Sequence, residues 1–145
     1  MAEGHERFET GRLEMFSDGV FAIIITLLVL DLRVPHAPEG VTLAARVAAM
    51  WPNFIAFIVS FMLVGVVWMN HHAMFRHIRE ADHTLNLLNL LLLLCVAVIP
   101  FVAAVSADSA RGTFEERRTA ALLYGAALVI GGVFFNLIWR SEELV

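Results

Sequence analysis

Four long apolar segments constrain this chain more than any other feature of its sequence. They cover about residues 16–32, 52–69, 85–105 and 119–139. Each segment is close to the roughly 20 residues that an α-helix needs to cross the hydrocarbon core of a bilayer. We therefore predict an all-α integral membrane protein, with four transmembrane helices in a single domain that takes up residues 1–145.

The composition agrees with a membrane protein and excludes other classes. Hydrophobic residues make up 59% of the 145 residues and charged residues 17%, against roughly 25% charged residues in soluble domains. A soluble fold of this length cannot bury so much apolar surface. The single cysteine, Cys95, excludes a disulfide scaffold, and the net charge of −4 argues against a nucleic-acid partner.

Local sequence signals refine the helices and argue against an enzyme. Pro52 suits the first turn of the second helix, whereas Pro100 should kink the third helix or mark its last turns. Acidic residues precede the first segment, and this charge is wrong for a signal peptide. The sequence has no nucleophile–base pair, no H-E-x-x-H motif and no glycine-rich phosphate loop, so we expect no enzymatic activity.

Polar residues at membrane depth carry the functional information, because such residues are costly in lipid. Asp18 and Asp31 are 13 residues apart in the first segment. This spacing corresponds to about 20 Å along a helix, whereas the hydrocarbon core is about 30 Å thick. Both carboxylates cannot lie comfortably in bulk water, so we expect protein or a water-filled path to shield at least one of them.

Helical geometry divides the first segment into two faces. At about 100° per residue, one face is an apolar stripe. The stripe consists of Ile23, Leu27 and Leu30. Asp31 lies beside this stripe, and Thr26 lies about 60° from it. Ser17 and Asp18 project to the opposite side, where they can meet neighbouring helices.

A carboxylate that is buried as an anion needs two or three hydrogen-bond donors. For Asp18, the candidate donors are His71 or His72, Asn89 and the indole of Trp68. The histidines could also suggest a metal or haem site. However, they lie at one helix end and in the following loop, and axial haem ligation needs histidines that face each other across a bundle. We therefore expect a polar network and no metal or other resident cofactor.

The stretch Arg12-x-x-x-Phe16-Ser17-Asp18 resembles the R-x-x-x-F-S-D signature of the transmembrane protein 175 potassium channels and their bacterial relatives. Further similarity covers residues 20–31, Trp68, His71-His72, Phe75, residues 88–90 and Pro100-Phe101. Bacterial members of this family usually have six helices per subunit. The sequence is therefore interpreted as a short, four-helix form, which is either a natural short member or a fragment of a longer chain.

This resemblance implies a homotetrameric cation channel that prefers potassium, with the first helix of each subunit lining the pore. It places the apolar constriction at Ile23, with Leu27 and Leu30 further along, and it links the Thr26 hydroxyl to potassium preference. A structural network would lie behind the pore helix. Its members would be Arg12, Phe16, Ser17, Asp18, Trp68, His71, His72 and Asn89.

The expected mechanism is conduction without a carbonyl filter, because the sequence has no T-V-G-Y-G stretch. Symmetric assembly would bring four Ile23 side chains to one axis, and such an apolar ring can close a pore by dewetting. An ion that passes the ring sheds part of its hydration shell, which potassium does more readily than sodium. Asp31 would form an acidic ring near one mouth and raise the local cation concentration.

Helical periodicity alone leaves simpler interpretations open. The apolar stripe could face lipid, Thr26 could bond only its own backbone, and Asp31 could be an exposed charge next to Arg33. The rival functions are an ion- or proton-coupled transporter, with Asp18 and His71 as the relay, and a non-conducting scaffold. The expected partners are copies of the same chain and the lipid of a bacterial cell membrane, and the only expected ligand is the permeant K⁺.

Overall fold

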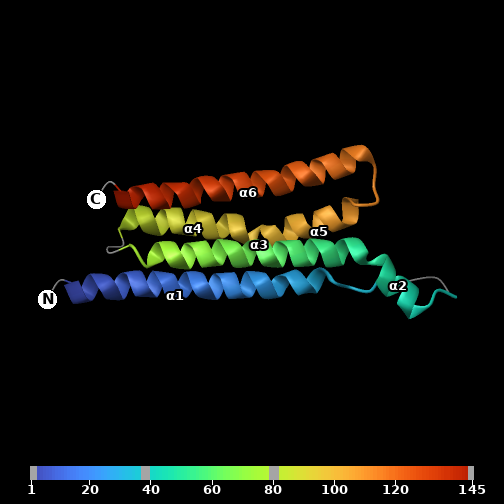
Figure 1. Cartoon of the computed structure of the whole chain (residues 1–145), viewed down its shortest axis with the longest axis horizontal. Coiled ribbons are helices and arrows are strands. Elements are labelled where there is room, and N and C mark those ends of the chain that lie inside the picture. The colour runs from blue at the N-terminus through green and yellow to red at the C-terminus, as the bar shows by residue number, and fades with distance from the viewer. Residues whose placement is uncertain (1–2, 37–39, 79–81, 144–145) are drawn as a thin grey trace.

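The computed structural model describes residues 3–36, 40–78 and 82–143, and within these ranges the chain is helical, without strands. Four candidate membrane spans lie roughly side by side in a bundle (Figure 1). They run over Thr10–Asp31, Trp51–Phe75, His83–Ser109 and Phe114–Arg140. The predicted all-α fold with four membrane-spanning helices is confirmed.

The elements follow one another in a simple antiparallel path, so that α1 begins and α6 ends at the same end of the bundle (Figure 1). In chain order they are α1 (Glu3–Leu27), the 3-10 helix η1 (Leu28–Asp31), α2 (Leu43–Ala49), α3 (Trp51–Phe75), α4 (His83–Ala97), α5 (Ile99–Ser109) and α6 (Phe114–Glu143). Most of the helices extend beyond the apolar segments of the sequence. Hydropathy marks only the stretch that suits lipid, whereas polar turns continue the same hydrogen-bond ladder at the helix ends.

Two prolines have the effects that the sequence predicts. Pro52 lies in the first turn of α3, where its missing N–H leaves no hydrogen bond unmade. Pro100 lies in the first turn of α5, directly after the break at Val98 that separates α4 from α5. A proline removes one helical hydrogen bond and crowds the preceding turn. The third span is therefore two shorter helices rather than one continuous helix.

The core forms where these helices meet. The first span packs against α3 and α4, while α6 packs against α4 and α5 on the other side of the bundle. Phe21, Val64 and Leu92 are among the fully buried residues of this core. By contrast, only 6% of the most apolar stretch of α6 is buried. An apolar exterior of this extent needs lipid or further protein around it.

Candidate functional site

The first span turns one face into the bundle. Ser17, Phe21, Ile24 and Leu28 are all buried, at intervals of three or four residues. This spacing matches the period of an α-helix, so these four side chains line one side of it. They meet α3, α4 and α5, which fix the rotation of α1 about its own axis.

The opposite face of the first span is an exposed apolar stripe. Ile23 is 60% exposed, Leu27 43% and Leu30 54%. The two faces that the helical period predicts are thus present in the structure. The stripe is apolar and continuous over two turns, and whatever covers it in the membrane comes from outside the single chain.

Two polar residues accompany the stripe near its end. The Thr26 hydroxyl donates to the backbone oxygen of Ile23 at 2.8 Å, and the side chain is exposed. Asp31 is exposed at the end of η1. Arg33 donates to the backbone oxygen of Leu30 at 3.0 Å, and within the described part of the chain it forms no ion pair with Asp31. The Asp31 carboxylate is therefore exposed and forms no ion pair among the described residues.

A chain of three fully buried polar side chains joins α1, α3 and α4. His71 Nε2 donates to Asn89 Oδ1 at 2.8 Å, and Asn89 Nδ2 donates to Ser17 Oγ at 2.9 Å. Ser17 Oγ in turn donates to the Leu13 backbone oxygen at 2.9 Å. Each donor in this series of hydrogen bonds points along the path from His71 to Leu13. The orientation of the Asn89 amide and the tautomer of His71 are therefore consistent with each other. Such a satisfied network fixes the contact between three helices.

The imidazole of His71 is also held by aromatic rings. It stacks on Phe75 with ring centroids 4.3 Å apart and meets Phe21 edge-on at 5.2 Å. Its Nδ1 atom is buried and has no hydrogen-bond partner among the described residues. An unprotonated nitrogen tolerates this apolar surrounding better than an N–H group, which agrees with the proton being on Nε2.

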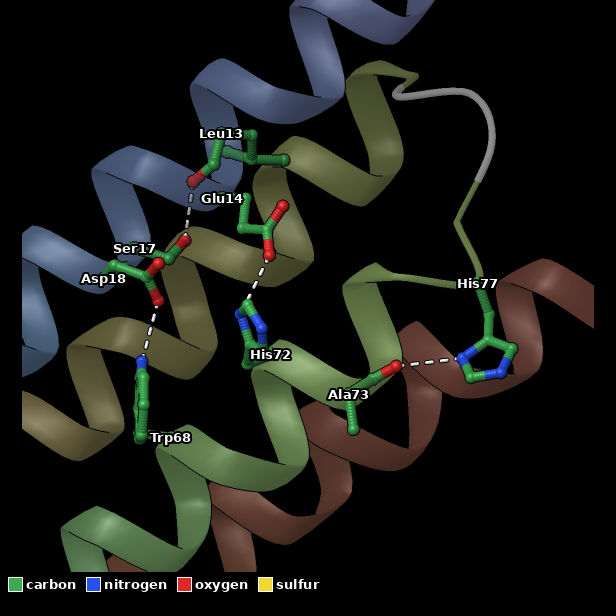
Figure 2. A network of polar contacts seen from close by, with 8 residues as sticks. All are labelled: Leu13, Glu14, Ser17, Asp18, Trp68, His72, Ala73 and His77. Atoms are coloured by element: carbon green, nitrogen blue, oxygen red, sulfur yellow. Dashed lines mark hydrogen bonds and ion pairs between the residues drawn. The ribbon is translucent and has the colours of Figure 1, made fainter.

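A second group of contacts joins α1 to α3 beside the buried chain. Trp68 Nε1 donates to Asp18 Oδ1 at 2.8 Å, and His72 Nδ1 lies 2.9 Å from Glu14 Oε1 (Figure 2). The Trp68 and His72 rings stack on each other with centroids 5.9 Å apart. Two acidic residues of α1 therefore face two ring nitrogens of α3, of which the Trp68 nitrogen donates a hydrogen bond, whereas His72 Nδ1 makes none among the described residues.

The contacts of Asp18 differ in detail from the sequence-based expectation. Of the candidate donors, only the Trp68 indole reaches this carboxylate, while Asn89 donates to Ser17 and His72 meets Glu14. Glu14 also belongs to this group, although it was not among the residues predicted from the sequence. Its position four residues before Asp18 could have revealed it, because residues four apart share one face of a helix.

Two residues of the motif do not join the network within the single chain. Arg12 and Phe16 are both exposed, and Arg12 makes no hydrogen bond or ion pair in the described ranges. At about 100° per residue, each lies within about 20° of Ile23 around the helix. They therefore lie on the same face of α1 as Ile23, nearer the start of the helix, and the Ser17–Asn89–His71 network lies on the other side.

Comparisons with known proteins give a consistent result. A family model described as the endosomal/lysosomal potassium channel TMEM175 matches residues 12–100. A potassium channel of Chamaesiphon minutus is 40% identical over 142 residues, which are 97% of this chain and 69% of that protein. The endosomal/lysosomal proton channel TMEM175 of Mus musculus is 35% identical over 152 residues, which cover 97% of this chain and 30% of that protein.

The fold is also similar to a solved structure. The crystal structure of a lysosomal potassium-selective channel TMEM175 homolog from Chamaesiphon minutus has a TM-score of 0.87 and 40% sequence identity. The match covers 92% of this chain and 71% of that chain. The residues of both polar groups described above lie inside the range that the family model matches.

Proposed function

Because the chain belongs to the TMEM175 potassium channel family, we propose that it conducts cations with a preference for potassium and that it does so as a homotetramer. The family is one of ion channels and not of enzymes, in agreement with the sequence. Its four apolar helices and its bacterial relatives identify the chain as an integral protein of a bacterial membrane.

The observation that carries this proposal is the exposed apolar stripe of α1 in a fold similar to that of a potassium-selective channel. One chain contributes a single first span, and a single helix cannot surround a pore. Rotational symmetry would bring one copy of the stripe from each subunit to a common axis. The buried chain of Ser17, Asn89 and His71 supports this arrangement, because it holds the opposite face of α1 against its own subunit.

In the proposed pore, the narrowest ring consists of the Ile23 side chains. Leu27 and Leu30 would add further rings, so that the apolar stretch would be roughly 10 Å long at 1.5 Å per residue. A narrow apolar stretch excludes a continuous water column, and an ion must shed part of its hydration shell to pass. Potassium gives up water more readily than sodium, which would produce a modest preference without a carbonyl filter.

Thr26 and Asp31 would act on the same path. The Thr26 hydroxyl donates its proton to the Ile23 backbone oxygen, so its own lone pairs are free to face a cation. Asp31 is exposed at the end of η1 and would form a ring of carboxylates at one mouth. A ring of negative charge raises the local cation concentration.

Two measurements on the purified chain test the proposal. The mass of the particle in detergent should correspond to four subunits. In liposomes, a potassium gradient should drive steady flux, and a sodium gradient should drive slower flux. A lone subunit, or liposomes that pass neither ion, would contradict the proposal.

The same liposomes distinguish the proposed channel from its rivals. A coupled transporter would move potassium only together with a proton or another ion, so its flux would depend on an imposed pH gradient. The mouse relative is named a proton channel, and a pH-sensitive dye inside the liposomes therefore measures proton entry separately. Proton entry without potassium flux would show that the permeant ion is the proton and not potassium. A non-conducting scaffold would show neither potassium flux nor proton entry.

A further inference from the structure

The contacts between α1 and α3 assemble a set of side chains that the channel mechanism does not use. Glu14 and Asp18 are one turn apart on α1, and Trp68 and His72 are one turn apart on α3. Figure 2 shows both acidic side chains pointing towards α3. One ligand atom from each of Glu14, Asp18 and His72 lies within 4.8 Å of the others.

Within the part of the chain whose side chains the structure describes, the negative charge of this group is not balanced by basic residues. Among the residues that the structure describes, no arginine lies within ion-pair distance of Glu14 or Asp18. In these described ranges, His72 is their only basic neighbour at that distance. With His72 neutral the group carries two negative charges, and with His72 protonated one negative charge remains. Unbalanced charge is costly in a membrane span, and a divalent cation would remove it.

We propose that Glu14, Asp18 and His72 bind a divalent transition-metal ion of the Zn²⁺ type. One imidazole nitrogen and two carboxylate oxygens are ligands that Zn²⁺ accepts, and a water molecule would complete a tetrahedral site. The imidazole disfavours Mg²⁺ and Ca²⁺, which prefer oxygen ligands throughout.

The distances agree with such a site. Metal–ligand bonds of about 2.0–2.2 Å place the ligands of a tetrahedral zinc site about 3.4 Å from one another. Glu14 Oε1 and His72 Nδ1 are already 2.9 Å apart, and the largest separation in the group exceeds the tetrahedral value by little more than an ångström. Rotation of the Glu14 and Asp18 side chains covers this difference without movement of the helices.

Neighbouring groups orient the ligands and leave them accessible. The Trp68 indole donates to one oxygen of Asp18, which limits the rotation of this carboxylate to small changes while its second oxygen is available. The same indole stacks on His72 and restrains its ring. The side chains of Glu14 and His72 are 26% and 45% exposed. The His72 Nδ1 atom itself is buried and has no hydrogen-bond partner among the described residues, so this nitrogen is available to a metal ion. No metal site was predicted from the sequence, because only the histidines were considered as ligands and not the carboxylates of α1.

A cobalt titration tests this site in the intact chain, purified with an affinity tag that contains no histidine. Tetrahedral Co²⁺ with nitrogen and oxygen ligands absorbs in the visible range, and Zn²⁺ should displace it and abolish the band. We expect one metal ion per chain and a melting temperature that rises with metal concentration. His72→Ala and Glu14→Gln should each weaken binding at least about tenfold, as loss of a metal-site interaction does.

Matched variants show whether the effect is specific. His77→Ala removes an exposed histidine from the same end of α3, and Glu115→Gln removes an exposed carboxylate at the start of α6. Neither should change the affinity. Absence of the cobalt band, or equal binding by wild type, His72→Ala and Glu14→Gln, would overturn the proposal. Glu14→Gln decides the question if His72→Ala does not fold, because Glu14→Gln leaves the Asp18–Trp68 contact intact. The test measures binding, so its outcome is independent of ion conduction.

Discussion

The two faces of α1 are stabilised in different ways. On the buried face, Ser17 is hydrogen-bonded to Asn89 and to its own helix, and the chain of contacts continues to His71. On the exposed face, the side chains of Ile23, Leu27 and Leu30 are 43–60% exposed and are not buried by their own subunit. The difference indicates that the buried face stabilises the structure of the subunit. The exposed face must be covered by lipid or by another protein chain. Changes on the first face should therefore lower stability, and changes on the second should alter ion flux.

The largest effect is expected from Asn89→Leu on the buried face. This change removes the acceptor of His71 and a donor to Ser17, and it leaves the buried Nε2–H of His71 without a partner. Loss of such a network should destabilise the subunit by about 2–4 kcal/mol, measured as a lower melting temperature in detergent. Asn86→Leu on the same helix is the control, because Asn86 forms no side-chain hydrogen bond in the described ranges. Equal destabilisation by both variants would show that the network has no special role.

Asp18→Ala should have the next largest effect, again on stability. It removes the acceptor of the Trp68 indole, and a hydrogen bond to a charged group contributes about 1.5–3 kcal/mol. We expect a lower yield of folded, assembled protein with unchanged ion preference in the fraction that assembles. Trp68→Phe removes the same hydrogen bond by removing its donor. The loss of stability in the double variant should therefore not exceed the sum of the losses in the two single variants. A well-folded Asp18→Ala protein with altered selectivity would instead place Asp18 in the ion path.

Ile23→Asn tests the exposed face. An amide at the constriction would hold water, so potassium flux in liposomes should rise about tenfold, which corresponds to a barrier lower by about 1.4 kcal/mol. The preference for potassium over sodium should fall, and the melting temperature should change little. Val29→Asn is the matched control, because Val29 in η1 is similarly exposed at 50% but lies about 120° away from Ile23 around the first span. Unaltered flux through Ile23→Asn would show that Ile23 is not at the constriction.

The smallest effect is expected from Asp31→Asn. Removal of a ring of carboxylates should lower potassium flux about twofold at low salt, because the local cation concentration falls. The effect should vanish near 1 M salt, where charges are screened over about 3 Å. Asp108→Asn is the control, since Asp108 is an exposed aspartate on α5 and not on the first span. A loss of flux that is independent of salt would contradict the role of Asp31 as an electrostatic ring.

Part of the site could be predicted from the sequence, and the reason is local geometry. The angle between Ser17 and Ile23 follows from the helical period alone, and the structure has these two residues on opposite faces. The partners of each polar group could not be predicted in the same way. Asn89 was a candidate donor to Asp18, yet it donates to Ser17, and Glu14 took the contact with His72 that had been considered for Asp18. Relative sliding of two helices by a single turn exchanges one partner for the other.

The sequence by itself determined the number of membrane spans, the break near Pro100 and the separation of α1 into an apolar and a polar face. These features depend on hydropathy, on the missing N–H of proline and on the helical period, which act within one segment. Only the tertiary structure decided that His71, Asn89 and Ser17 form one chain and that Glu14, Asp18 and His72 meet beside it. Such contacts join residues up to 72 positions apart, and they depend on the register of packed helices, which no single segment encodes.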